Sequence, residues 1–214
     1  VSGVLKIVAC GAVAVAFLYG YDYLRKRNLL KGEFFVLGLF ALLGIMVLVS
    51  ANSLVTLYLG VELLALSLYA MVAFNRDPGV SAEAAIKYFV LGSIASGSLL
   101  YGISMIYGAT GHLDLDAVAD ASLGAQGNRT LLVLGLVFVV SGIAFKLGVV
   151  PYHMWVPDVY HGAPTPITLL IGTAPKLAAF AFTLRVLAGA LKGLEFDWQG
   201  MLVKQFQGGI SADD

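Results

Sequence analysis

The chain has 214 residues, and its 13 lysine and arginine residues balance 13 aspartate and glutamate residues. It is 59% hydrophobic and 12% charged, with a mean hydropathy of +0.89, whereas soluble domains carry about 25% charged residues. A soluble fold could not cover its surface with so few polar side chains. The composition also excludes a basic nucleic-acid-binding protein and an acidic disordered segment. A single cysteine, Cys10, cannot form an internal disulfide, so the sequence predicts an integral membrane protein.

Runs without charge locate the membrane spans. A bilayer core of about 30 Å needs about 20 apolar helical residues. Between Phe34 and Asn75 only Glu62 is charged, and this run is too long for one span, so we place a break at the polar residues 50–53. The same reasoning predicts an all-α membrane protein with six membrane-spanning helices, at residues 4–21, 34–50, 54–75, 82–108, 130–150 and 166–191.

The segments between the spans indicate the orientation of the chain. Basic residues crowd into 25–31, which favours a cytoplasmic first loop. Alternation of the spans then places 75–78 and 152–164 on the same side of the membrane. We treat 1–200 as one transmembrane domain and expect 201–214 to be a polar, loose tail.

Three charged residues lie deep within predicted spans, namely Glu62, Lys146 and Lys176. Each such residue costs roughly 2.5–3.5 kcal/mol at the centre of a membrane helix. Mutual pairing and a water-filled cavity are the usual compensation, and transport of an ion or a proton is the usual reason. The alternative is a purely structural ion pair between packed helices.

A proline lies beside each of the two lysines. Pro151 removes a backbone donor and frees the carbonyl of Leu147, and Pro175 frees the carbonyl of Ile171 in the same way. Carbonyls that are freed at membrane depth need water or a cation. The pattern therefore predicts discontinuous helices that line a wet path, with one discontinuity near Pro151.

These residues suggest a proton relay. Burial and nearby charges can change the proton affinity of a lysine by several orders of magnitude. Our hypothesis is that Glu62 sets the proton affinity of Lys146, and that Lys146 passes its proton toward Lys176.

Other candidates carry weaker signals. Lys87 follows Glu83 by four residues, which fits a surface ion pair, with a relay role as the alternative. His153, and less so His161, could connect Lys146 with cytoplasmic water. No further ligands join these histidines in the sequence, so we expect no metal site.

Several stretches resemble the antiporter-like membrane subunits of respiratory complex I. These stretches are GVELLALSLYAM at 60–71, AAIKYF at 84–89 and FKLGVVPYHMWVPD at 145–158. The continuation VYHGAPTP at 159–166, with TAPK at 173–176, most resembles the subunit N group of bacterial NADH:quinone oxidoreductases. Related cation/proton antiporters share the glutamate and the Lys-x4-Pro-x-His-x-Trp pattern.

The resemblance implies roles for individual residues. Glu62 matches the essential glutamate of the family, Lys146 the lysine of a broken helix, Lys176 the central lysine of the next helix and Lys87 an auxiliary lysine. Helices two to six would form the first of two inverted five-helix repeats. The second repeat has no counterpart in the sequence, so we expect a fragment of a longer subunit.

The resemblance also implies the setting. The expected location is the inner membrane of a bacterium, crossed several times, with other complex I membrane subunits, lipid and protons as partners. NADH, FMN, iron–sulfur clusters and quinone would bind elsewhere in the complex, and this chain would carry no cofactor. The function that the resemblance implies is a proton-translocating membrane subunit of NADH:quinone oxidoreductase, coupled to quinone reduction elsewhere in the complex. The alternatives are a subunit of a cation/proton antiporter and a membrane subunit that does not transport.

Overall fold

The computed structural model describes residues 2–75, 79–124 and 129–192. Within these ranges the chain is helical and forms no strand, apart from a single bridge between Ser53 and Asp114. The elements are α1 (Ser2–Lys26), α2 (Gly32–Ser50), α3 (Leu54–Val72), α4 (Gly79–Thr110), α5 (Leu115–Gly124), α6 (Arg129–Leu147), α7 (Trp155–Gly162) and α8 (Thr165–Lys192).

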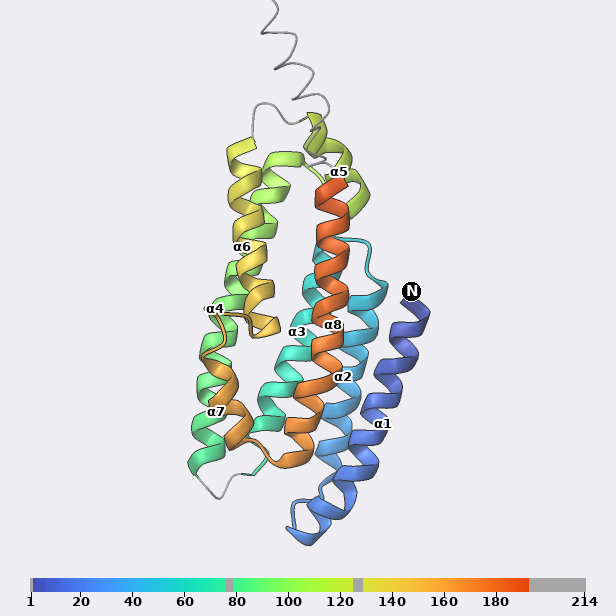
Figure 1. The fold of residues 1–214 in the computed structure, drawn as a ribbon, viewed down its shortest axis with the longest axis vertical. Coiled ribbons are helices and arrows are strands. Elements are labelled where there is room, and N and C mark those ends of the chain that lie inside the picture. Colours follow the sequence, from blue (N-terminus) through green and yellow to red (C-terminus); the bar gives the residue numbers. More distant parts are fainter. Residues whose placement is uncertain (1, 76–78, 125–128, 193–214) are drawn as a thin grey trace, which may run out of the picture.

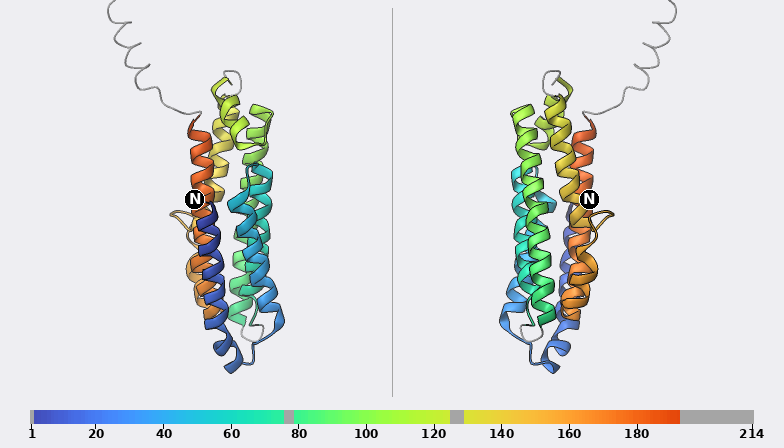
Figure 2. Two further views of the ribbon diagram at one scale, coloured as in Figure 1. Left: turned by 90° about the vertical axis from the view of Figure 1, so that its right-hand side faces the viewer. Right: turned by 90° about the vertical axis from the view of Figure 1, so that its left-hand side faces the viewer.

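The predicted all-α membrane fold is confirmed. In the described ranges six helices are long and apolar enough to cross a bilayer, and they are α1, α2, α3, α4, α6 and α8. They form an elongated bundle in which α1 and α8 run side by side (Figures 1 and 2). The proposed tail at 201–214 lies outside the described residues.

The connections alternate between the two ends of the bundle, as the spans predicted. The loop after α1, the end of α3, the start of α4 and the turn between α7 and α8 lie at one end, while α5 lies at the other (Figure 1). Because α6 stops partway along the bundle, α7 completes that crossing on the same side as α4.

Two short helices, α5 and α7, were not predicted. Although prolines crowd residues 151–164, Pro157 lies in the first turn of α7, where a backbone N–H has no helical partner to lose. Burial of Trp155 and Val159 fixes this short helix against the bundle.

Glycines bring the long helices into close contact. A Cβ atom on Gly44 would lie 2.9 Å from the carbonyl oxygen of Gly60, and one on Gly102 would lie 2.6 Å from that of Gly135. Backbone approach at small residues is the usual way in which helices pack in lipid. It fixes α2 against α3 and α4 against α6, and thereby holds Glu62 and Lys146 on a rigid frame.

Candidate functional site

The predicted discontinuity near Pro151 is present, because α6 ends at Leu147. Gly148 adopts a positive φ of 71°, its N–H donates to the carbonyl of Phe145, and the N–H of Val149 donates to that of Ala144, each at 3.0 Å. This is a Schellman motif, in which glycine is favoured because it has no Cβ atom. The carbonyls of the last residues of α6 remain open to other partners.

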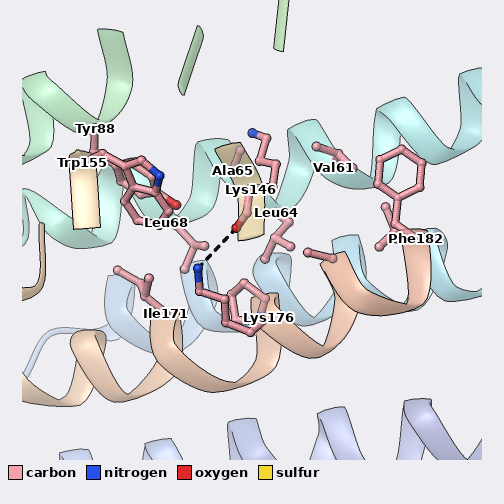
Figure 3. Close-up of a pocket in the computed structure, with 13 residues that line it drawn as sticks. Val61, Leu64, Ala65, Leu68, Tyr88, Lys146, Trp155, Ile171, Lys176 and Phe182 are labelled. Carbon is pink, nitrogen blue, oxygen red and sulfur yellow. Dashed lines mark hydrogen bonds between the residues drawn. The ribbon is translucent and has the colours of Figure 1, made fainter. Parts of the chain in front are cut away.

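Lys176 occupies this helix end from α8. Its Nζ donates to the carbonyl oxygen of Leu147 at 2.6 Å and lies 3.4 Å from that of Lys146. Figure 3 shows Lys176 reaching toward the backbone of Lys146. A cation at a helix C-terminus is stabilised by the helix dipole. The carbonyl that Pro151 was predicted to free therefore has a cation as its partner.

Pro175 has a different effect from the predicted one. Although it directly precedes Lys176, α8 continues through it from Thr165 to Lys192. The expectation of a second discontinuous helix is therefore wrong. Neighbouring helices support a proline within a membrane helix, and α1, α2 and α6 all pack against α8.

Lys146 is half-buried and binds a hydroxyl group. Its Nζ donates to Ser96 Oγ on α4 at 3.3 Å and lies 6.0 Å from the centroid of the Tyr69 ring. In the described part of the chain no ion pair within 4.0 Å joins Lys146 to Glu62, so the expected direct pairing is not formed. One carboxylate oxygen of Glu62, Oε1, is buried without a protein partner among those residues.

A cavity of about 40 Å³ lies between α3, α6 and α8. Lys146 and Lys176 are its charged lining residues, and its walls include Tyr88, Trp155 and Phe182. Figure 3 shows the two lysines between Trp155 and Tyr88 on one side and Phe182 on the other. One water needs about 10–15 Å³ by this measure, so this space is large enough to hold water.

Trp155 is buried at this site. It is 2% exposed, its Nε1 donates to the carbonyl of Phe145 at 3.0 Å, and its ring stacks on Tyr88 at 4.7 Å. Lys176 Nζ lies 5.0 Å from the Trp155 ring, within the range of a cation–π interaction. No local sequence signal could have identified these contacts, because they join four separate elements.

Lys87 lies outside the cavity and links two helices. Its ammonium pairs with Glu83 on α4 at 2.8 Å, as the spacing predicted, and with Asp158 on α7 at 3.2 Å. All three side chains are between 44% and 66% exposed. The contact with Asp158 was missed because the two residues are far apart in the sequence.

The remaining candidates lie at the periphery. His153 is exposed in the turn between α6 and α7, and His161 is exposed on α7. The described residues contain no cluster of potential metal ligands. Arg185 donates to the carbonyl of Ala51 at the end of α2.

Six apolar helices, one of them ending partway along the bundle, and two lysines at one cavity define a multi-pass helical membrane protein with an antiporter-like fold. The chain belongs to the family described as NADH:quinone oxidoreductase/Mrp antiporter, TM, whose profile matches residues 51–203. It is accordingly a multi-pass protein of the bacterial inner membrane.

Individual proteins of known name share high sequence identity with this chain. NADH-quinone oxidoreductase subunit N of Thiobacillus denitrificans is 61% identical over 94% of this chain, and that of Nitrosomonas europaea is 58% identical. The chain spans 42% of the length of each of these relatives.

Two solved structures contain chains that are similar to this one in fold and sequence. A chain of respiratory complex I from Thermus thermophilus is 37% identical, with a TM-score of 0.71 over 86% of this chain and 39% of that one. A chain of the Mrp complex from Dietzia is 25% identical, with a TM-score of 0.64 over 78% of this chain and 31% of that one.

Proposed function

We propose that this chain carries part of a proton path in the membrane arm of an NADH:quinone oxidoreductase. The observation that carries the proposal is the cavity that Lys146 and Lys176 both line at the end of a broken helix. The high identity to proteins named as subunit N of this enzyme supports the choice of enzyme.

The path uses this chain's own side chains. A proton leaves the Lys146 ammonium for a cavity water, and the same water protonates the amine of Lys176. One N–H bond breaks as another forms, so the step involves no redox chemistry. In this path Glu62 sets the proton affinity of Lys146.

The broken helix gives the charge on Lys176 a defined place. Carbonyls at the end of α6 accept from its Nζ, with the shortest contact at 2.6 Å, and the Trp155 ring lies beneath it. These groups stabilise an ammonium ion at membrane depth without a carboxylate partner. Lys176 is thereby suited to receive a proton from the cavity.

Lys87 and His153 would connect this path with water on the side of the membrane where the loop between α1 and α2 lies. Both side chains are exposed and lie outside the cavity. In this role they deliver protons to the region of Lys146, and a change at either residue slows uptake without abolishing it.

The wider setting belongs to the proposal. NADH, FMN, iron–sulfur clusters and quinone would be bound by other subunits, and the redox reaction there would drive proton movement here. Other membrane subunits of the complex would pack against the exposed apolar faces of this chain, with lipid on the remainder.

The test uses Lys146→Met and Glu62→Gln in the whole complex, with the exposed Lys26→Met as a matched control. We expect both site variants to lose most NADH-driven proton translocation in inverted membrane vesicles, while Lys26→Met retains it. Unchanged translocation in Lys146→Met would refute the proposal.

Cation/proton antiport is the second candidate, favoured by the similarity to the Mrp complex. It predicts transport that depends on sodium and continues without a redox partner. Measuring vesicle acidification with and without sodium, in the presence and absence of NADH, separates the two functions.

A further inference from the structure

The buried hydroxyl of Tyr69 is a polar group that the path above does not use. Tyr69 lies on α3 and is 7% exposed, and within the described residues its hydroxyl has no hydrogen-bond partner. Burying a hydroxyl without a hydrogen-bond partner is unfavourable. Such a group in a native protein calls for a partner that is not a protein atom, which in this site means water.

A second buried oxygen lies on the same face of the helix. Glu62 Oε1 also lacks a partner among the described residues, and Glu62 precedes Tyr69 by seven residues. Residues at this spacing share a helix face and are about 10 Å apart along the axis. Both side chains therefore border the same strip of α3.

Lys146 supplies donors to this strip. Its ammonium lies 6.0 Å from the centroid of the Tyr69 ring, and an ammonium has three N–H donors, of which Ser96 accepts one. Spare donors on Lys146 thus lie near the spare oxygen of Tyr69. Water molecules that each make about three hydrogen bonds could satisfy these groups and reach Glu62 along the same face of α3.

A glycine on α4 makes room for the Tyr69 hydroxyl. Gly92 on α4 contacts the Tyr69 oxygen, and a Cβ atom at this position would lie 2.7 Å from the ring carbon that bears the hydroxyl. Ser96 lies one turn further along α4, on the same face. The hydroxyl is therefore directed toward the face that also holds the partner of Lys146.

We propose that Tyr69 is a positioning residue of the proton path, whose hydroxyl holds the water that links the carboxylate of Glu62 with the ammonium of Lys146. The inference rests on the proposed function and deepens it. A hydroxyl both donates and accepts, so it can hold water in line for proton transfer without carrying the proton itself. Each transfer breaks one O–H or N–H bond as another forms, and requires no oxidant.

The test is Tyr69→Phe in the whole complex, which removes the hydroxyl and retains the buried ring. Tyr101→Phe on α4, where the side chain is 54% exposed, is the matched control. Rates of NADH-driven proton translocation are expressed per assembled complex, so that a loss of assembly is not counted as a loss of function. We expect a fall of about tenfold for Tyr69→Phe, which is about 1.4 kcal/mol, and no change for Tyr101→Phe.

A second readout does not depend on transport. Infrared difference spectra would report the carboxylate band of Glu62, to be assigned by its loss in Glu62→Gln. Tyr69→Phe should shift this band because the water that hydrogen-bonds to the carboxyl group loses its other partner, whereas Tyr101→Phe should leave it in place.

The outcomes separate the two proposals. If Tyr69→Phe translocates at the parent rate with an unshifted band, while Glu62→Gln and Lys146→Met are slow, the role of Tyr69 is overturned and the proposed function stands. If the Glu62 and Lys146 variants are also unaffected, the proposed function fails and the role of Tyr69 fails with it.

Discussion

Two prolines lie beside two lysines in this chain, and only one of them accompanies a helix break. α6 ends at Leu147, shortly before Pro151, whereas α8 continues through Pro175. The difference lies in the surrounding groups. Gly148 provides the left-handed turn. Lys176 Nζ donates to the carbonyl of Leu147, and Trp155 Nε1 donates to the carbonyl of Phe145. A proline in a membrane helix therefore marks a break only when a turn residue and partners for the carbonyls are also present.

The largest effect is expected from Lys176→Met. This change retains an unbranched side chain but removes the donor from the carbonyls of α6, and an unpaired buried carbonyl costs about 1–3 kcal/mol. We expect lower thermal stability of the purified complex together with lost proton translocation. Lys176→Arg keeps a donor at this place and should recover the stability more than the transport. A Lys176→Met complex as stable as the parent would show that the cation does not hold the helix end.

Gly148→Ala tests the turn itself. A left-handed conformation costs an ordinary residue about 1–2 kcal/mol, and the new Cβ atom would lie 2.9 Å from a methyl group of Val156 and 3.1 Å from Lys176 Nζ. Thermal unfolding should show a loss of stability. Gly172→Ala in α8 is the matched control, because its nearest neighbour would be 3.6 Å away. Equal behaviour of the two variants would contradict the account of the break.

Pro175→Ala tests the proline that lies in an unbroken helix. The change restores a backbone donor for the carbonyl of Ile171 within a helix that is already continuous. We expect the stability of the complex to stay the same or to rise by at most about 1 kcal/mol. A marked loss of stability would mean that the proline shapes α8 in a way that the continuous helix does not show.

The smallest effect is expected at the exposed end of α7. Asp158→Asn removes one of the two carboxylates that pair with Lys87. Exposed ion pairs contribute little and are screened by salt, so a slight loss of stability should vanish at high ionic strength. Glu83→Gln, which removes the pair within α4, is the comparison. A large effect that persists in high salt would indicate that Lys87 does more than hold α7 in place.

The sequence was sufficient for the six long helices and for the break after Lys146. The spans follow from uncharged runs that are long enough to cross the thickness of a bilayer, and such runs are visible in neighbouring residues of the sequence. The freed carbonyl of Leu147 could be foreseen because proline acts on a residue at a fixed spacing. Even the pair between Glu83 and Lys87 follows from helix periodicity.

The site required the third dimension. Nothing in the sequence indicates that Lys176 would meet the end of α6, that Trp155 would be buried against Tyr88, or that Asp158 would reach Lys87. Glu62 and Lys146 have the charges of an ion pair, yet the packing of α3 and α6 against α4 leaves Ser96 as the partner of Lys146. Contacts between distant residues depend on how helices pack, which local patterns do not encode.

The central claim is that two lysines share a wet cavity at the end of a broken helix. An experimental map of the complex, at a resolution that shows ordered water, tests it most directly. The account predicts water between the ammonium groups of Lys146 and Lys176, with Lys176 Nζ bonded to the carbonyl of Leu147. A dry, collapsed space between them, or a Lys176 side chain turned away from α6, would contradict it.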